Sequence, residues 1–117
     1  MTNTLCLGSH DELYLLDLDR ILFLEADDHY TNVQYATGTR FMVPFGLSKV
    51  EAAITEHRPD EVKRMMRLGR RYIVNLERVF RINTIKSTLF LFDDLGNNVP
   101  IQIPKPVLRS LIDLLRR

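Results

Sequence analysis

The side chains best suited to catalysis or metal binding are few and scattered. The histidines His10, His29 and His57 lack the short spacings that place two ligands on one metal ion. The carboxylate pairs Asp27-Asp28 and Asp93-Asp94 fall in expected turns, where aspartate is common. A hydrolase or transferase would also need a pocket of converging polar groups, which no motif predicts. We therefore expect no enzyme activity, no catalytic residues, no metal, no cofactor and no small-molecule substrate.

Thiol and phosphate-loop chemistry are equally unsupported. Cys6 is the single cysteine, which excludes an internal disulfide and a four-thiolate metal site. It lies in an apolar segment, so we expect it to pack in the core rather than act as a nucleophile. The five glycines are dispersed and form no glycine-rich phosphate loop. The remaining functional groups with a marked pattern are the basic ones.

Basic residues are concentrated in one short segment. Residues 63–81 hold seven cations and one acid, whereas residues 1–62 hold eleven acids and four cations, in a chain whose net charge is +1. Such a segment can attract a polyanion despite a nearly neutral total. Alternatively, its arginines alternate with apolar residues and only form the solvent face of strands. The cations of the segment are Lys63, Arg64, Arg67, Arg70, Arg71, Arg78 and Arg81.

The length and hydropathy of the chain indicate what kind of protein carries these basic residues. A chain of 117 residues fits a single domain, here 1–117. Its longest purely apolar stretch, 21–24, is too short to cross a membrane. The N-terminus has no basic residue before its short apolar run and makes a poor signal peptide. We expect a soluble, cytoplasmic protein that does not associate with membranes.

Most elements are predicted to be short strands. Turn signals at 37–39 and 93–98 join neighbouring strands into two hairpins. In two segments the apolar residues follow the period of a helix instead of alternating as in a strand. This pattern predicts one helix over 47–54 and a second over 107–115 that begins at Pro104 or Pro106. The expected strands are 12–18, 21–25, 30–35, 40–44, 72–74, 79–82, 88–92 and 99–103. The pattern predicts a compact, mainly β domain of antiparallel strands with two small helices.

Three segments, in order, resemble the LytTR family of DNA-binding domains, which are output domains of many bacterial response regulators. Residues 21–30, ILFLEADDHY, are similar to the family pattern I-x-x-I-E-A-x-x-x-Y. Residues 66–76, MRLGRRYIVNL, are similar to R-x-H-R-S-Y-I-V-N-L, and this is the most specific match. Residues 99–101, VPI, resemble the start of l-P-v-S-R before the last helix. The likeness covers nearly the whole chain.

The resemblance implies a compact, mostly β domain that binds duplex DNA through loops rather than a recognition helix. The family's groove-entering positions correspond to Asp28 or His29, to Arg70, and to the region 102–105. The chain departs from the pattern at Gly69, where the family usually has histidine, and at Arg71, where it has serine. The usual Ser-Arg pair is replaced by Gln102-Ile103, so Lys105 is only the nearest cation.

From these positions we predict DNA base contacts at Arg70, His29 and Lys105. An arginine at the Arg70 position can donate two hydrogen bonds to guanine O6 and N7. Four further cations of the basic segment, Lys63, Arg64, Arg67 and Arg71, are predicted to contact phosphates. Asn75 is expected to hydrogen-bond a neighbouring backbone turn instead of a base. Tyr30, Tyr72 and Phe23 are expected to pack in the core or on a strand face.

Two classes of function are consistent with these features. The first is a sequence-specific, duplex DNA-binding transcription regulator of a bacterial two-component system. Its sites are expected to be paired repeats, on which two copies form a homodimer. The second is a small, non-enzymatic interaction domain whose basic segment binds an acidic protein partner. A steep dependence of affinity on salt distinguishes DNA binding from the alternative.

Overall fold

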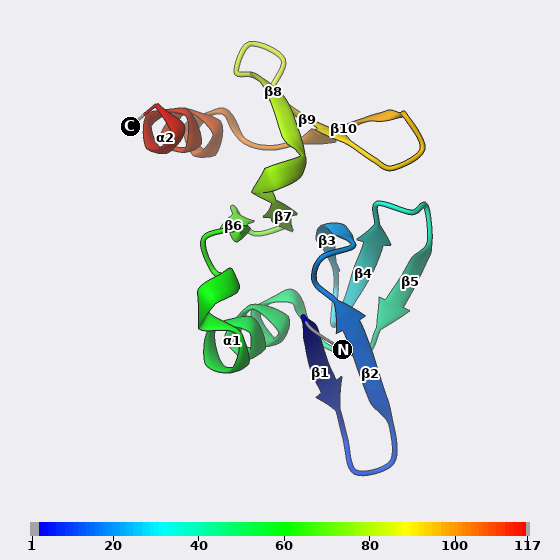
Figure 1. Ribbon diagram of the computed structural model, residues 1–117. Coiled ribbons are helices and arrows are strands. Elements are labelled where there is room, and N and C mark those ends of the chain that lie inside the picture. The colour runs from blue at the N-terminus through cyan, green and yellow to red at the C-terminus, as the bar shows by residue number, and fades with distance from the viewer. Residues whose placement is uncertain (1–2, 117) are drawn as a thin grey trace.

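A computed structural model describes residues 3–116, which fold into ten strands, two α-helices and two short 3-10 helices (Figure 1). All strand pairs are antiparallel. The predicted mainly β class is therefore confirmed. The strands are β1 (Thr4–Gly8), β2 (Leu13–Asp17), β3 (Ile21–Asp27), β4 (Tyr30–Tyr35), β5 (Arg40–Val43), β6 (Met65–Leu68), β7 (Tyr72–Asn75), β8 (Val79–Asn83), β9 (Thr88–Phe92) and β10 (Asn98–Gln102). The helices are α1 (Leu47–His57), η1 (Pro59–Glu61), η2 (Leu76–Arg78) and α2 (Lys105–Leu115).

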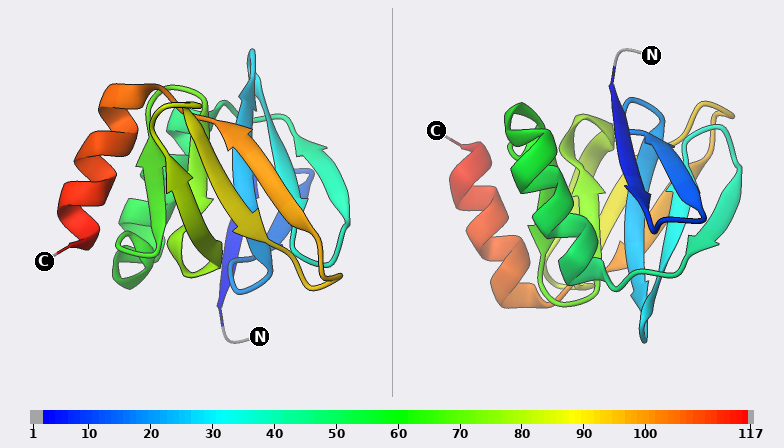
Figure 2. Two further views of the ribbon diagram at one scale, coloured as in Figure 1. Left: turned by 90° about the horizontal axis from the view of Figure 1, so that it is seen from above. Right: turned by 90° about the horizontal axis from the view of Figure 1, so that it is seen from below.

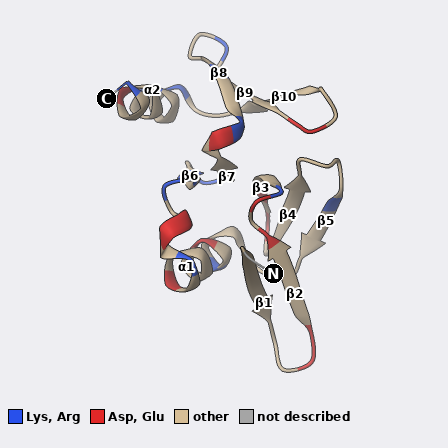
Figure 3. Cartoon of the chain, in the orientation of Figure 1, with Lys and Arg blue, Asp and Glu red and all other residues tan. Residues whose placement is uncertain are grey.

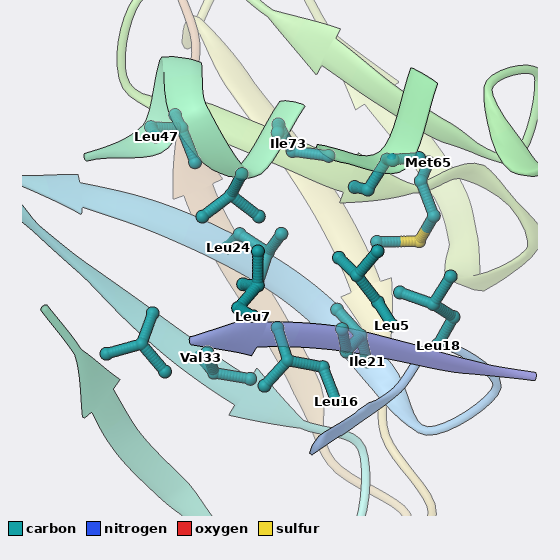
Figure 4. Close-up of a cluster of buried hydrophobic side chains, with 13 residues drawn as sticks. Leu5, Leu7, Leu16, Leu18, Ile21, Leu24, Val33, Leu47, Met65 and Ile73 are labelled. Carbon is teal, nitrogen blue, oxygen red and sulfur yellow. The ribbon is translucent and has the colours of Figure 1, made fainter. Parts of the chain in front are cut away.

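A five-stranded sheet in the order β5-β4-β3-β7-β6 separates two hydrophobic cores. One face packs against the β1–β2 hairpin and α1, and the other against the sheet β10-β9-β8 and α2 (Figure 2). Strand alternation assigns neighbouring residues to different cores. Leu24 lies opposite Ile73 in the first core (Figure 4), while Phe23 lies opposite Val74 in the second.

The same alternation shows that the prediction for Cys6 is wrong. Leu5 and Leu7 of β1 are buried in the first core, and Cys6 between them is exposed. It lies opposite Leu15, which is also exposed. The apolar character of the segment indicated burial, but a strand packed on one face buries only every second side chain.

Local signals explain the predicted hairpins and helices. The β4–β5 turn contains Gly38 at φ +98°, a conformation that glycine adopts without strain. Helix α1 follows Gly46 and ends just before Pro59, and α2 follows Pro104. Strand β6 was not predicted, because its four residues, MMRL, show no alternation of apolar and polar side chains. Within residues 3–116, no helix is long and apolar enough to cross a membrane.

Asn75 has the structural role expected from the sequence. Its side chain is buried, and Nδ2 donates a hydrogen bond to the carbonyl of Ile21 at 2.9 Å. Its Oδ1 accepts a hydrogen bond from the backbone N–H of Glu77 at 3.1 Å, at the start of η2. Asn75 thus fastens the end of β7 to β3 and begins the turn toward β8. Tyr72 and Phe23 are buried as expected, and Tyr30 lies on the face of β4, 47% exposed.

Candidate nucleic-acid interface

Three chain turns meet at one end of the central sheet. The β3–β4 turn contains Asp28 and His29, and the β6–β7 turn spans 69–71. These two turns are adjacent, because the backbone N–H of Ala26 donates to the carbonyl of Arg71 at 2.7 Å. A groove runs from the β6–β7 turn to the junction of β10 and α2, where Gln102, Ile103 and Pro104 line it, and Lys105 follows directly. The structure therefore brings together the three regions that carry the predicted base contacts.

Arg70 lies at the centre of the β6–β7 turn with its side chain exposed. Within residues 3–116, no carboxylate forms an ion pair with its guanidinium. The preceding Gly69 has φ +74°, and an added Cβ would approach Val107 and Pro104 at 3.8 and 4.0 Å. These are ordinary contact distances, so glycine is favoured here by the positive φ and not by a lack of space. This geometry leaves the Arg70 side chain free to reach a ligand.

Arg67 holds this turn in place from within the protein. Its Nε donates to the carbonyl of Gly69 and its Nη2 to the carbonyl of Arg70, both at 2.9 Å. Its Nη1 lies 3.0 Å from Oε1 of Glu51 on α1, and the side chain is only 22% exposed. A single guanidinium thus joins the turn to α1 and satisfies two backbone carbonyls. These contacts give Arg67 a positioning role in the turn, and its predicted phosphate contact stays a prediction.

Arg71 combines an internal ion pair with a largely exposed side chain. Its Nη2 lies 2.8 Å from Oε2 of Glu25 on β3, yet the side chain is 66% exposed. The guanidinium also lies over the ring of Tyr72, 5.6 Å from its centroid. Arg71 is therefore fixed in direction while part of its guanidinium faces solvent.

Lys63 and Arg64 lie away from these turns. In the β6–β7 pair, Leu68 is opposite Tyr72 beside the turn, whereas Met65 is opposite Asn75 at the far end. Lys63 is exposed just before that far end. The basic segment is folded back on itself, so its charge is spread over several elements instead of forming one patch (Figure 3).

Arg64 is occupied by internal ion pairs. Its Nη2 lies 2.6 Å from Glu61 and 3.0 Å from Asp19, and Nη1 lies 3.8 Å from Glu77. Its side chain is 16% exposed. Burial opposes the charged form, but the bonds to Asp19 and the charge of Glu61 outweigh it and raise the pKa of Arg64. Arg64 thus has a structural role in the folded domain, and its predicted phosphate contact stays a prediction.

The other two predicted base contacts are exposed at the edges of the interface. His29 lies at the tip of the β3–β4 turn, with Nε2 3.7 Å from Oδ1 of Asp28. Asp28 has φ +56°, which aspartate tolerates better than most residues. Lys105 is the first residue of α2 and is exposed, and the first turn of this helix contains no acidic residue. The positive end of the helix dipole and Lys105 therefore act in the same direction on an anion.

Residues outside the predicted set also contribute to this end of the sheet. Glu25 and Arg40 were not predicted as site residues, although Glu25 is within the quoted family segment. Arg40 Nη2 lies 3.0 Å from Glu25 Oε1. The period-two pattern of β3, β4 and β5 could have identified this pair from the sequence, because it places the side chains of Glu25 and Arg40 on one face of the sheet. Among residues 3–116 there is no group of three His, Cys, Asp or Glu able to hold a metal ion.

Comparisons with known proteins agree with this architecture. The LytTr DNA-binding domain family matches residues 11–116. A solved structure of the LytTr DNA-binding domain from a Bacillus cereus protein, described as a methyl-accepting/DNA response regulator, superimposes with a TM-score of 0.65. The two chains are 22% identical, and the match covers 98% of each, which shows a shared fold. A comparison with curated proteins gives no match. Because the family match extends over nearly the whole chain, this chain belongs to the LytTR family of DNA-binding domains.

Proposed function

We propose that this domain binds duplex DNA with sequence preference and regulates transcription as the output of a bacterial response regulator. The observation that carries this proposal is the convergence of three turns at one end of the sheet. Arg70 has no ion-pair partner among residues 3–116 and lies in a turn that Arg67 holds. Family membership supports DNA as the ligand. The B. cereus relative, described as a response regulator, supports the regulatory role.

In the proposed mode of binding, the turns enter the grooves and the helices stay outside. Arg70 reads a base edge, since a guanidinium can donate two parallel hydrogen bonds to a guanine. His29 and Lys105 flank it from the neighbouring turns. Arg71 contacts a phosphate with the outer side of its guanidinium. We further propose that two copies occupy paired repeats, and that the protein acts in the cytoplasm.

The salt dependence of DNA binding tests this mode. Arg70, Arg71 and Lys105 together bring three positive charges to the DNA, which offset about three phosphate charges, so log K against log salt should have a slope of about −3. The slope can be measured by fluorescence anisotropy with a labelled duplex, at salt concentrations from about 0.05 to about 0.3 M. A duplex selected from random sequences should bind more tightly than a scrambled one at every salt concentration.

The alternative of an acidic protein partner gives a different result. In that case the domain would bind selected and scrambled duplexes with equal, weak affinity, and selection from random duplexes would yield no common motif. That outcome would exclude sequence-specific DNA binding.

A further inference from the structure

The carboxylate of Glu25 is the centre of a charged group that links three strands. Its Oε2 accepts hydrogen bonds from Arg71 Nε and from the hydroxyl of Tyr72, both at 3.1 Å, and its Oε1 accepts one from Arg40 Nη2 at 3.0 Å. Burial alone would raise the pKa of this carboxyl. The hydrogen bonds from Arg40 and Tyr72 and the charge of Arg71 outweigh burial and leave the pKa below its ordinary value. Glu25 is thus ionised at neutral pH.

The two arginines retain donors that Glu25 does not use. The Glu25 side chain is only 13% exposed, whereas Arg40 is 44% and Arg71 66% exposed. Arg40 also donates Nη1 to the side-chain oxygen of Gln34 at 3.2 Å. A guanidinium has five N–H donors, so each arginine keeps free donors on its solvent side. The negative charge is covered, and the group has a net charge of +1 at its exposed surface.

The surface beside this group is not covered by the second layer. On that face of the sheet, the second core includes residues of β3, β7 and β6 but stops short of β5. The side chains of β4 and β5 on this face are polar or exposed: Asn32, Gln34, Arg40 and Met42. This uncovered face adjoins the β3–β4 turn and therefore continues the proposed DNA interface.

We propose that Arg40 and Arg71, bridged by Glu25, form a phosphate-binding site for the backbone of the bound nucleic acid. The site extends the interface from the turns over the face of β4 and β5. It rests on the proposed function, because it takes its phosphate from the duplex that Arg70 contacts. Hydrogen bonds from guanidinium to phosphate are charge-assisted and geometrically specific.

Glu25 acts as a positioning residue in this site. Free arginine side chains lose considerable rotamer freedom when they bind a ligand. Here the carboxylate already holds both guanidinium groups on one face of the sheet, so less freedom is lost when a phosphate binds. The arrangement also fixes the distance between the two cations, which a flexible pair could not do.

The test compares Arg40→Gln with a matched variant, Arg20→Gln. Arg20 is also an exposed arginine paired with a carboxylate, with its Nε 3.2 Å from Oδ2 of Asp17. It lies just before the first residue of β3, at the end of that strand opposite the β3–β4 turn. Both variants lose one positive charge. Arg40→Gln should weaken binding to selected and scrambled duplexes alike, by roughly fivefold to tenfold near 0.1 M salt, and reduce the salt slope by about one unit. Arg20→Gln should leave the slope unchanged.

Two further results make the test decisive. Arg40→Lys should restore most of the salt slope because it restores the charge, and thermal melts should show that all variants fold, since Glu25 keeps Arg71 and Tyr72 as partners. Equal slopes for Arg40→Gln and Arg20→Gln, with a wild-type domain that binds its selected duplex, would overturn the Arg40 site alone. A wild-type domain that does not bind DNA would overturn the proposed function itself.

Discussion

Replacing Arg70 with alanine is expected to weaken binding to the selected duplex by about 1–3 kcal/mol, on the order of fivefold to 150-fold. The reason is that Arg70 is exposed, has no carboxylate partner within residues 3–116 and lies where the three turns meet. The preference at one base position should also be lost, because the bidentate contact to that base is gone. Affinities for the selected duplex and for single-base variants of it measure both effects.

The control for Arg70→Ala is Arg20→Ala, which removes an exposed arginine from the far end of the sheet. The Arg20 variant should bind both duplexes nearly as the wild type does. Thermal stability should change by less than about 0.5 kcal/mol in Arg70→Ala, as for most surface substitutions. A loss of the same factor on selected and scrambled duplexes would instead make Arg70 a phosphate contact and assign base reading to another turn.

Arg67→Lys should reduce affinity for the selected duplex by about 1.5–3 kcal/mol, on the order of tenfold to 150-fold, while leaving the salt slope unchanged. Lysine keeps the charge but cannot bond the carbonyls of Gly69 and Arg70 and the carboxylate of Glu51 in the same planar geometry. The turn should therefore lose its fixed position, and the Arg70 side chain should no longer be held in the orientation that contacts the base. Affinity, salt slope and thermal melts of the same samples measure the effect.

The matched control for Arg67→Lys is Glu51→Gln. It removes the charge at the α1 end of the contact but leaves both carbonyl bonds from Arg67 in place. Its loss of affinity should be much smaller than that of Arg67→Lys. If Arg67→Lys instead retains full affinity and Arg67→Gln lowers the salt slope by about one unit, Arg67 contacts a phosphate directly, and the positioning role is wrong.

Elements formed by neighbouring residues could be predicted from the sequence. The β4–β5 and β9–β10 hairpins and both helices depend on local signals, such as Gly38 in a turn and Pro104 before α2. The role of Asn75 was also predictable, because a polar side chain at the end of an apolar strand needs a backbone partner. In each case the determining residues lie close together in the chain or obey a strand or helix period.

The roles of the individual arginines could not be predicted in the same way. Arg64 pairs with Asp19, and Arg71 with Glu25, across separations of 45 and 46 residues. Only the folded sheet brings these acids from the first half of the chain to the basic segment. Arg67 is bound to backbone carbonyls, whose positions depend on the geometry of the turn at Gly69. Charge counted along the sequence therefore does not show which of these cations have partners within the protein.

The most direct test of the central claim is a map of backbone amide chemical shifts, recorded by NMR while a duplex is added to the domain. We predict the largest shifts in the three turns, at 27–30, 69–71 and 102–105, with smaller shifts at Arg40. The β1–β2 hairpin packs on the other face of the central sheet, and the start of β6 near Lys63 lies at the end of the strand far from the β6–β7 turn, so both should remain nearly unchanged. Shifts concentrated on the β1–β2 hairpin, on α1 or around Lys63 would contradict a DNA interface formed by these turns.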